Sequence, residues 1–386
     1  MSGLLLVLAA LQGAALAVLL ARLAGGRTRT PPLAPLSALP EPTRVSAVVP
    51  TLNEEARIGP CLEGLHAQGP ELVEVIVVDS RSTDGTVAQV EAMAKRDRRF
   101  KVVYDDPLPT GWVGRPWALQ SGFLRTDPAS EWVLGIDADT LPLPGLVNAI
   151  VAAARAGNYD ALSLSPRFLL VGLAEFWLQP ALLITLVYRF GAAGGAGSPR
   201  PERVMANGQC SLLRRQMLVA MDGYTAARRS FCDDVTLARS LAARGVRVGF
   251  LDGAQLIKVR MYSSALETWN EWGRSLDLKD ASTPGWQVFD CLFLVLALGL
   301  PIPVLALATA GLIEFAPLIW VNGLLVAIRL LLLFAIAGSY ERLRWSYWLS
   351  PLADPLAALR IVISSLTVPR RWRGRNYDNL DRQPVQ

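Results

Sequence analysis

Two carboxylates one residue apart, Asp137 and Asp139, follow a short apolar run that reads Val133-Leu-Gly-Ile136. The run predicts a buried strand, and the turn-prone Leu141-Pro-Leu-Pro-Gly145 follows the acids. Carboxylates at a strand end offer hard oxygen ligands to a divalent cation that keeps some of its water. In open α/β sheets, nucleotides bind at this edge. The pair therefore predicts a site for a metal-bound diphosphate; a helix cap with a solvated loop acid is the alternative.

Polar side chains also follow two earlier apolar runs. The first run, residues 45–49, is followed by three of them: Thr51, Asn53 and Glu54. The second run ends at Asp79. Because the carboxyl ends of parallel strands meet at one edge of a sheet, we expect these groups to form a pocket for a base and ribose beside the acidic pair.

Residues 44–284 have the pattern of a globular α/β domain. Strands are predicted at 45–49, 73–78, 101–104 and 133–136, with helices at 56–68 and 86–97 between them. This alternation predicts a mostly parallel sheet covered on both faces. No Gly-x-Gly-x-x-Gly follows the first strand and no phosphate loop ends in Gly-Lys-Ser/Thr, which argues against hydride transfer and kinase chemistry.

Acid–base chemistry in this chain must come from carboxylates. The single histidine, His66, falls on a predicted helical surface, which excludes a histidine-based triad or a histidine-rich metal site. The four cysteines have no Cys-x-x-Cys spacing, so neither a zinc site nor a disulfide framework is indicated.

The composition indicates a membrane protein. Of the 386 residues, 52% are hydrophobic and 18% are charged, and the formal net charge is +5. The basic residues gather beside apolar stretches at 21–29 and 369–375, which favours anionic lipid headgroups and not nucleic acid as the partner.

Residues 1–25 are predicted to form an N-terminal transmembrane anchor. The apolar run is long for a cleaved signal peptide and no basic residue precedes it, so we favour the anchor over that alternative. Arginines 22, 27 and 29 follow the run and predict that the domain lies on the cytoplasmic face of the cell membrane. Residues 26–43 are Pro-rich and predict a stiff linker.

Residues 285–338 predict two further transmembrane helices. Arg329 lies inside the second of them and requires a polar partner, for which Asp290 is a candidate. Residues 339–386 are interpreted as an interfacial or re-entrant segment with a basic tail, because a further span would export that tail against the positive-inside rule.

Residues 168–190 form another apolar stretch, interrupted by polar residues. We favour a helix lying in the membrane interface. A span would instead move the residues after it across the membrane, away from Asp137 and Asp139.

Three motifs together resemble the family 2 glycosyltransferases, which have the GT-A fold. They are Val-Val-Pro-Thr-Leu-Asn-Glu-Glu at 48–55, Val-Val-Asp-Ser-Arg-Ser-Thr-Asp-Gly-Thr at 77–86 and Asp-Ala-Asp at 137–139. The resemblance implies a Rossmann-like nucleotide-diphospho-sugar transferase domain over 44–284, with membrane helices on either side. It implies a nucleotide sugar donor, most simply a UDP-hexose, and a divalent metal, Mg²⁺ or Mn²⁺.

The resemblance also assigns donor-site residues. Base and ribose contacts fall on Thr51, Asn53, Glu54 and Asp79. Asp139 becomes the metal ligand, and Asp137 assists through the nucleotide or a metal-bound water. Arg115 stands where many relatives have Lys, and it can still neutralise the diphosphate.

Asp233 and Asp234 occupy the place of the acidic pair in which the second residue is the catalytic base. An inverting transfer needs such a base to take the proton of the acceptor hydroxyl. The alternative is that both acids cap the helix predicted at 235–244. Trp269, Trp272 and Arg274 loosely match a diphosphate-binding region, and membrane-interface anchors are the alternative for the two aromatics.

Within the family, the stretch 111–118 looks like carotenoid- and hopanoid-associated members. The residues 207–209, 233–234 and 269–280 look most like the carotenoid branch. This implies a single sugar added to a membrane lipid, with a hydroxylated carotenoid favoured over a hopanoid, another polyprenoid or a glycerolipid. A non-catalytic scaffold that binds nucleotide sugar and a nucleotidyltransferase that makes the donor are the alternatives from other classes.

Overall fold

A computed structural model of the chain describes residues 2–195, 200–273, 275–367, 371–372 and 375–376. Contacts divide the chain into two units. We call Thr30–Phe168 with Gly197–Met261 the sheet unit, and Met1–Arg29, Leu169–Ala196 and Tyr262–Pro369 the helical unit. Of the predicted domain 44–284, the ranges 169–196 and 262–284 are assigned to the helical unit.

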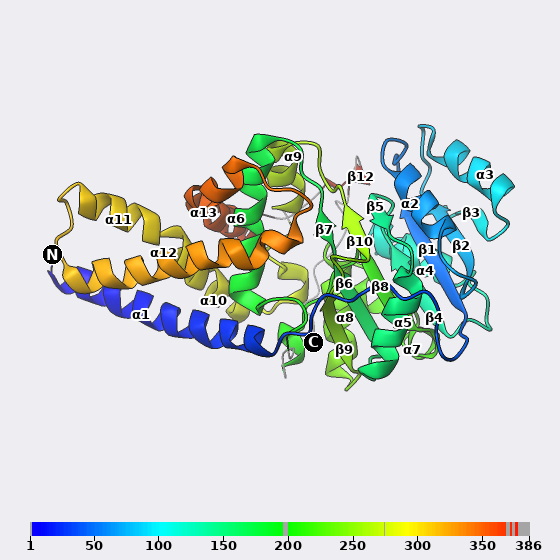
Figure 1. The fold of residues 1–386 in the computed structure, drawn as a ribbon, viewed down its shortest axis with the longest axis horizontal. Coiled ribbons are helices and arrows are strands. Elements are labelled where there is room, and N and C mark those ends of the chain that lie inside the picture. The colour runs from blue at the N-terminus through cyan, green and yellow to red at the C-terminus, as the bar shows by residue number, and fades with distance from the viewer. Residues whose placement is uncertain (1, 196–199, 274, 368–370, 373–374, 377–386) are drawn as a thin grey trace. The chain divides into compact units, whose positions relative to one another are not determined.

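The sheet unit is built on a seven-stranded sheet with the order β3-β2-β1-β4-β8-β6-β9 (Figure 1). The strands are β1 (Val45–Thr51), β2 (Leu72–Asp79), β3 (Phe100–Tyr104), β4 (Trp132–Ile136), β6 (Ala161–Ser165), β8 (Cys210–Arg214) and β9 (Val248–Asp252). β8 runs antiparallel to both of its neighbours, and the other pairs are parallel. The mostly parallel α/β sheet predicted from the sequence is therefore confirmed.

Helices cover both faces of this sheet, because its strands are apolar on both sides. The helices are α2 (Ile58–His66), α3 (Thr86–Arg96), α4 (Gly114–Phe123), α5 (Leu146–Ala156), α7 (Arg215–Ala220) and α8 (Asp233–Ala243). Side chains of β1 alternate between two cores: Ala47 and Val49 pack with α2, α3 and α5, whereas Val48 packs with α4 and α8. The predicted helices at 56–68 and 86–97 are confirmed; α2 is shorter by two residues at each end, and α3 by one residue at its C-terminal end.

A small second sheet fixes the chain directly after the Asp-x-Asp pair. It consists of β5 (Thr140–Pro142), β10 (Ile257–Val259) and β7 (Arg167–Phe168). Thr140 pairs with Val259, and the amide of Arg260 donates to the carbonyl of Asp139 at 3.3 Å. The turn that carries the acids is thus held from both sides.

The segment predicted as a stiff linker packs along the sheet unit. The amide of Leu33 donates to the carbonyl of Asp252 at 2.9 Å, and the amide of Leu36 donates to that of Gly145 at 3.4 Å. Gly145 has a φ of +82°, and a Cβ there would lie 2.8 Å from the Leu36 nitrogen. The close crossing requires glycine at this position. Leucines spaced among the prolines pack against the core with their side chains partly buried.

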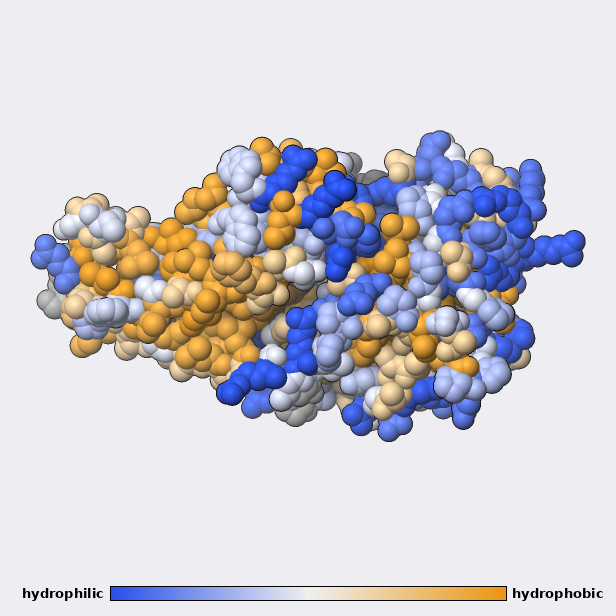
Figure 2. Space-filling model, viewed as in Figure 1, coloured by the Kyte–Doolittle hydropathy of each residue, from blue (hydrophilic) through white to orange (hydrophobic). Residues whose placement is uncertain are grey.

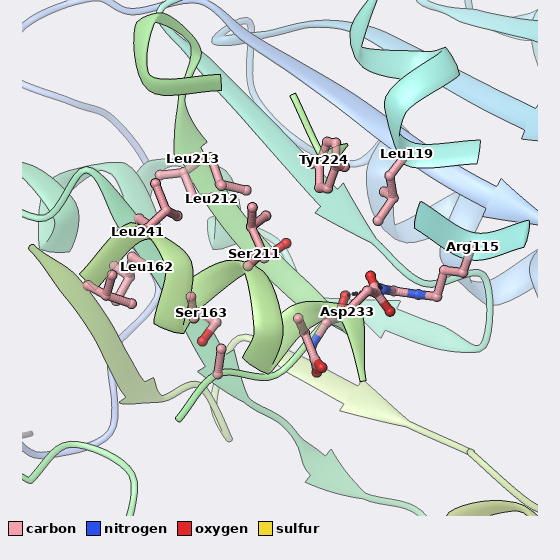
Figure 3. Close-up of a pocket in the computed structure, with 17 residues that line it drawn as sticks. Arg115, Leu119, Leu162, Ser163, Ser211, Leu212, Leu213, Tyr224, Asp233 and Leu241 are labelled. Carbon is pink, nitrogen blue, oxygen red and sulfur yellow. Dashed lines mark hydrogen bonds and ion pairs between the residues drawn. The ribbon is translucent and has the colours of Figure 1, made fainter. Parts of the chain in front are cut away.

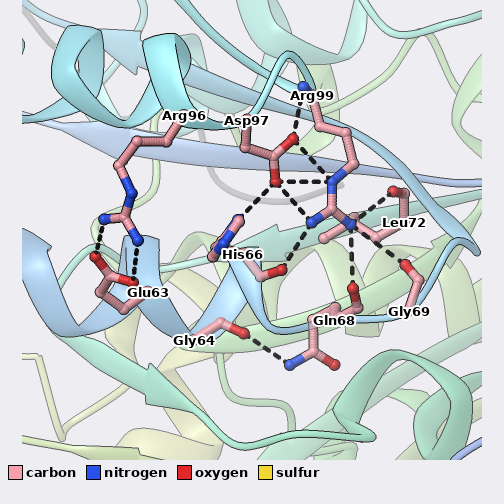
Figure 4. A network of polar contacts seen from close by, with 9 residues as sticks. All are labelled: Glu63, Gly64, His66, Gln68, Gly69, Leu72, Arg96, Asp97 and Arg99. Carbon is pink, nitrogen blue, oxygen red and sulfur yellow. Dashed lines mark hydrogen bonds and ion pairs between the residues drawn. The ribbon is translucent and has the colours of Figure 1, made fainter.

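The only histidine belongs to a structural network (Figure 4). The Arg99 guanidinium donates to the carbonyl of His66 at 2.7 Å and to three further carbonyls between Gln68 and Leu72. Asp97 accepts from both Arg99 and His66, and the hydrogen bonds from Arg99 hold its pKa well below the ordinary range. The network closes the C-terminal end of α2, whose last carbonyls have no partner within the helix.

The helical unit contains α1 (Ser2–Ala24), α6 (Leu173–Phe190), α10 (Pro284–Leu294), α11 (Pro301–Thr309), α12 (Ala316–Ile336), η8 (Trp345–Ala353) and α13 (Asp354–Leu366). Within the described residues, four helical stretches are long and apolar enough to cross a membrane: Gly3–Thr28, Pro284–Thr309, Ala316–Ser339 and Trp345–Leu366. Three match the predicted spans. The fourth covers the segment interpreted as interfacial, and it is the most buried of the four.

Hydrophobic residues gather over the surface of the helical unit, whereas the visible face of the sheet unit is mostly hydrophilic (Figure 2). Large apolar side chains such as Leu4, Trp320 and Phe334 are about three-quarters exposed, at 69–75%. Exposed apolar surface of this extent suits contact with lipid.

The partner predicted for Arg329 was wrong. Its Nε and Nη2 donate to the Asp354 carboxylate at 2.8 and 3.0 Å, and Nη2 also donates to Ser350 at 3.2 Å. Asp290 lies instead 3.8 Å from Arg22. The segment after α12 folds back against that helix and supplies the acid, which hydropathy alone does not reveal.

Candidate active site

The predicted acidic and polar side chains meet at one edge of the sheet. Thr51 pairs with Asp79 across β1 and β2, and Val48 pairs with Gly135, so β4 ends beside them. The amide of Asp137 donates to the carbonyl of Gln209 at 3.2 Å, which brings the start of β8 to the same edge. Three strand ends and one strand beginning therefore surround the site.

Arg115, in the first turn of α4, joins the two acidic pairs. Its Nε and Nη2 donate to Asp137 Oδ1 at 3.1 and 2.8 Å, and its Nη1 donates to Asp233 (Figure 3). Nη2 also donates to the carbonyl of Gly208 at 2.8 Å. Arg115 was predicted to contact a diphosphate, a role that stays a prediction. In this structure its guanidinium links carboxylates that lie 96 residues apart in the chain.

Asp233 and Asp234 begin α8. Asp234 Oδ2 accepts from the amide of Gly208 at 2.7 Å, and its Oδ1 accepts from that of Val235 at 2.8 Å. The acids therefore do lie in the first turn of a helix, as the alternative interpretation held. They also face Arg115 and the loop before β8, which a simple helix cap does not require.

Asp139 has a buried carboxylate oxygen, Oδ1, that accepts no hydrogen bond from any described residue. Burial, and then the charge of Asp137, raises the pKa of Asp139 to about 7 against the opposing charges of Arg57 and Arg115. A buried oxygen that lacks a donor is unfavourable unless a ligand compensates it. A cation at this position would do so, and the residues present therefore fit a divalent metal.

Among the described residues, no group of three or more His, Cys, Asp or Glu side chains gathers to hold a metal. The site offers only the Asp137 and Asp139 carboxylates. Mg²⁺-type sites are commonly completed by substrate phosphates and water around one or two carboxylates. The arrangement suits an ion that arrives together with a diphosphate.

The side chains predicted to hold base and ribose shape the loop after β2. Asn53, with a φ of 55°, accepts from the amide of Thr83 at 2.8 Å through its Oδ1. Asp79 Oδ2 accepts from the amide of Ser82 at 3.0 Å. Thr51 donates to the carbonyl of Val78 at 3.1 Å. The structure brings these three residues together, as predicted.

Glu54 differs from this group. It is 2% exposed, and its Oε2 accepts from Arg57 Nε at 2.9 Å. Arg57 in turn donates to the carbonyl of Met261 at 3.2 Å, and its charge acts on Asp139. Arg57 was not predicted as a site residue. It lies three residues after Glu54, but Glu54 precedes the helix predicted at 56–68, so no helical spacing indicated the pair.

Three further predicted positions belong to the helical unit or fall outside the described residues. Arg274 falls outside the described residues. Trp269 and Trp272 lie in a π-helical turn of the helical unit, Thr268–Trp272, where the Arg360 guanidinium stacks 5.5 Å from the Trp269 ring. Their predicted contact with diphosphate stays a prediction.

Gly208 is a second residue whose role the sequence did not reveal. A Cβ at this position would lie 2.6 Å from Arg115 Nη2.

Gly208→Ala should therefore displace the guanidinium from its carboxylates without unfolding the chain. We expect at least a tenfold loss of the proposed activity, about the effect of a misplaced positioning group. Ala206→Gly in the same loop is the control. Wild-type turnover by Gly208→Ala would show that the link through Arg115 does not matter.

The fold of the chain is shared with a solved structure, the mannosyltransferase PcManGT of Pyrobaculum calidifontis, in complex with GDP-Man and Mn²⁺. The TM-score is 0.57 at 20% identity, covering 94% of this chain and 98% of that one. The chain therefore has the GT-A fold, as predicted.

The sequence comparisons find similarity to glycosyltransferases. Residues 46–220 match the model of Glycosyl transferase family 2. The chain is 35% identical over 95 residues to the lipopolysaccharide core biosynthesis glycosyltransferase LpsC of Rhizobium meliloti, covering 25% of this chain and 31% of that one. It is 24% identical over 242 residues to the 4,4'-diaponeurosporenoate glycosyltransferase of Staphylococcus haemolyticus, covering 62% of each.

The chain thus spans between about a third and three-fifths of the length of these two relatives. Both are glycosyltransferases, as is the solved structure. At the level of the domain, the predicted enzyme class is confirmed.

Proposed function

We propose that the protein is an inverting, metal-dependent glycosyltransferase that moves a single hexose from a nucleotide sugar to a hydroxyl of a membrane lipid. The observation that carries this proposal is the Arg115 link between Asp137 and Asp233. This link joins two pairs of carboxylates into one cluster. Asp137 and Asp139 would hold the metal and the diphosphate. Asp233 and Asp234 are suited to proton abstraction. A protein that only binds nucleotide sugar has no need of the second pair.

The donor would occupy the edge formed by β1, β2 and β4. Thr51, Asn53 and Asp79 would contact base and ribose, and Asp137 and Asp139 would hold the metal with the diphosphate. The GDP-Man and Mn²⁺ bound to the mannosyltransferase support a nucleotide sugar and a divalent metal in general. We infer a UDP-hexose with Mg²⁺ or Mn²⁺. When bound, the metal would neutralise charge on the departing diphosphate.

Asp234 would act as the base. Its carboxylate takes the proton of the acceptor hydroxyl as that oxygen attacks the anomeric carbon. The bond from the anomeric carbon to the diphosphate oxygen breaks on the opposite side, so the configuration inverts. The amides of Gly208 and Val235 hold both oxygens of Asp234, and Arg115 holds Asp233 beside it. Glu54 would act indirectly, by positioning Arg57, and Arg274 is still proposed as a diphosphate contact.

The acid pair predicts how transfer depends on pH. Burial, and then the neighbouring charges of Asp234 and Asp137, raises the pKa of Asp233 to about 6 despite Arg115. Burial likewise raises the pKa of Asp234 above its ordinary value of 3.8. A base works only when deprotonated, so kcat should fall on the acidic side at a pH above the ordinary carboxyl pKa of 3.8. A pH profile of kcat with saturating donor checks this expectation; a flat profile down to pH 4.5 contradicts it.

The pH dependence of folding stability has the opposite sign. A carboxyl whose pKa is raised in the folded chain stabilises the fold at pH values below the pKa of that carboxyl in the unfolded chain. This contribution to stability is lost as the pH rises through about 6, the raised pKa of Asp233. Asp233→Asn should therefore gain stability relative to wild type across that window, measured as the difference in Tm.

The acceptor we infer is a hydroxylated carotenoid, with a hopanoid, another polyprenoid or a glycerolipid as alternatives. The diaponeurosporenoate glycosyltransferase relative supports the carotenoid, and the four apolar helices support membrane association. The arginines after the first of these helices support an integral protein of the cell membrane with its catalytic domain on the cytoplasmic face.

A comparison of whole lipid extracts tests this function. Cells carrying the wild-type chain should contain a pigment or lipid that is heavier by one hexose, and cells carrying Asp139→Ala should lack it. Glu91→Ala, an exposed acid on α3, is the matched control and should keep the product. Identical lipid masses in all three, with the variants folded and in the membrane, would overturn the lipid acceptor.

A further inference from the structure

One side of α2 lies along the segment that carries Asp137 and Asp139. The residues on this side are spaced four, three and four positions apart, which places them on one face of a helix. They are Arg57, Cys61, Gly64 and Gln68, the first and last of which flank the ends of α2. We call these four residues the α2 stripe, and residues 137–147 the acid segment.

The far end of the acid segment is held by Gln68. Its Nε2 donates to the carbonyl of Leu143 at 3.0 Å, and its Oε1 accepts from the amide of Val147 at 3.2 Å. Gln68 Nε2 also donates to the carbonyl of Gly64 at 2.8 Å, within the stripe itself (Figure 4). Because Gln68 is buried, these hydrogen bonds are protected from water.

Gly64 lets α2 approach the acid segment closely. A Cβ at this position would lie 2.3 Å from the carbonyl oxygen of Pro142 and 2.8 Å from its Cδ. No side chain larger than hydrogen fits there unless the helix or the segment moves. The distance between α2 and the acid segment is therefore set by this glycine.

Cys61 contacts the backbone between the two acids. Its thiol donates to the carbonyl of Asp137 at 3.6 Å, and Thr140 Oγ1 donates to the same carbonyl at 2.7 Å. Cys61 is fully buried. This carbonyl belongs to the peptide group that links Asp137 to Ala138, so the contacts hold the turn from which both carboxylates leave the chain.

Arg57 connects the acid segment with the loop after β1. Its Nε donates to Glu54 Oε2 at 2.9 Å, and its Nη1 donates to the carbonyl of Met261 at 3.2 Å. The preceding residue, Arg260, donates its amide to the carbonyl of Asp139 at 3.3 Å. Arg57 therefore holds the strand end that in turn holds Asp139.

We propose that the α2 stripe positions Asp137 and Asp139 for the metal. Its members are positioning residues, because they act on the backbone that carries the two acids. A cation held by only two carboxylates depends on the exact placement of their oxygens, and supporting contacts provide that placement. This inference rests on the proposed function and adds to it the helix face that determines metal affinity.

Gly64→Ala tests the stripe directly, with Gly59→Ala as a matched control in the same helix. A Cβ at Gly59 would lie 3.5 Å from Gln89 Oε1, an ordinary contact, and both substitutions bring the same gain in helix propensity. The full chain in lipid nanodiscs would be titrated with Mn²⁺ in the presence of UDP and followed by electron paramagnetic resonance. We expect Gly64→Ala to bind Mn²⁺ about 10- to 100-fold more weakly, the usual effect of a lost supporting contact. Gly59→Ala should bind as wild type does.

Arg57→Gln is the second variant, in case alanine at position 64 prevents folding. The Arg57 side chain is 30% exposed, so the fold should tolerate its loss. We expect Mn²⁺ affinity to fall about tenfold. Arg57→Lys keeps the charge but not the forked guanidinium, so its affinity should lie between those of Arg57→Gln and wild type. Arg98→Gln, at an exposed arginine of the sheet unit, is the control.

The melting temperature of each metal-free sample separates positioning from mere support of the fold. A purely structural role would lower Tm and leave the Mn²⁺ affinity of the folded chain unchanged. Wild-type Mn²⁺ affinity in both Gly64→Ala and Arg57→Gln would overturn the role of the α2 stripe and leave the proposed function standing. If wild type itself binds no Mn²⁺ with UDP, the proposed metal site is wrong, and this inference is overturned with it.

Discussion

Asp234→Asn lowers kcat for hexose transfer by about 10²- to 10⁴-fold, because the proton of the acceptor hydroxyl then has no base to accept it. Asparagine keeps the shape of the side chain and one oxygen that can accept from the amide of Gly208 or Val235. Binding of the nucleoside diphosphate should therefore persist. Initial rates at saturating donor, together with calorimetric titration of the diphosphate, measure both quantities on the same preparation.

Asp233→Asn is the matched comparison, since it changes the adjacent carboxyl in the same turn of α8. It removes a partner of Arg115, so we expect a smaller loss of kcat than Asp234→Asn gives, together with weaker diphosphate binding. A larger loss in Asp233→Asn, with Asp234→Asn near wild type, would transfer the role of base to Asp233.

Asp139→Asn is expected to lower kcat/KM by about 10³-fold, since the metal charge on the diphosphate supplies several kcal/mol of stabilisation. The same substitution should raise the Tm of the metal-free chain. In wild type the buried carboxylate has no donor at Oδ1 and its pKa is raised to about 7, which shows that its charged form is disfavoured. Loss of activity with a gain in stability is typical of a binding residue.

Manganese binding provides the readout for this second prediction. Electron paramagnetic resonance of Mn²⁺ in the presence of nucleoside diphosphate should report tight binding to wild type and much weaker binding to Asp139→Asn. Glu91→Gln, on an exposed helix face, should bind as wild type does. Equal Mn²⁺ affinity in all three would contradict the assignment of Asp139 as a metal ligand.

Much of the site was predictable because it depends on local pattern. An apolar run followed by acids, as at Val133–Asp139, encodes both the strand and the place where its last side chains leave the sheet. Parallel pairing then brings Thr51 and Asp79 to the same edge without further information. These residues required only the strand period and the usual handedness of α/β units.

The partners of charged side chains were not predictable, because they depend on contacts distant in sequence. Arg115 bonds to acids 22 and 118 residues away, and nothing local distinguishes this from a phosphate contact. Arg329 pairs with Asp354 and not with Asp290 for the same reason. Hydropathy shows that such a group must be paired but does not identify its partner.

The burial of polar side chains was also not predictable from the sequence. The stretch 168–190 was interpreted as interfacial from its polar residues, yet Glu175, Gln179 and Arg189 of α6 are each 2% exposed. A helix that carries polar groups toward protein has the same pattern as one that carries them toward water. In the predicted linker, the prolines indicated stiffness, and the sequence did not reveal that Leu33 and Leu36 pack against the core of the sheet unit.

One stoichiometric measurement tests the central claim most directly. The purified full chain in nanodiscs, given nucleotide sugar, Mn²⁺ and an extract of membrane lipids, should release one nucleoside diphosphate for each lipid hexoside, with the anomeric configuration inverted. Asp234→Asn should form neither product at a comparable rate. Diphosphate release without a lipid hexoside, a retained configuration, or equal rates in wild type and Asp234→Asn would contradict an inverting lipid glycosyltransferase that uses this site.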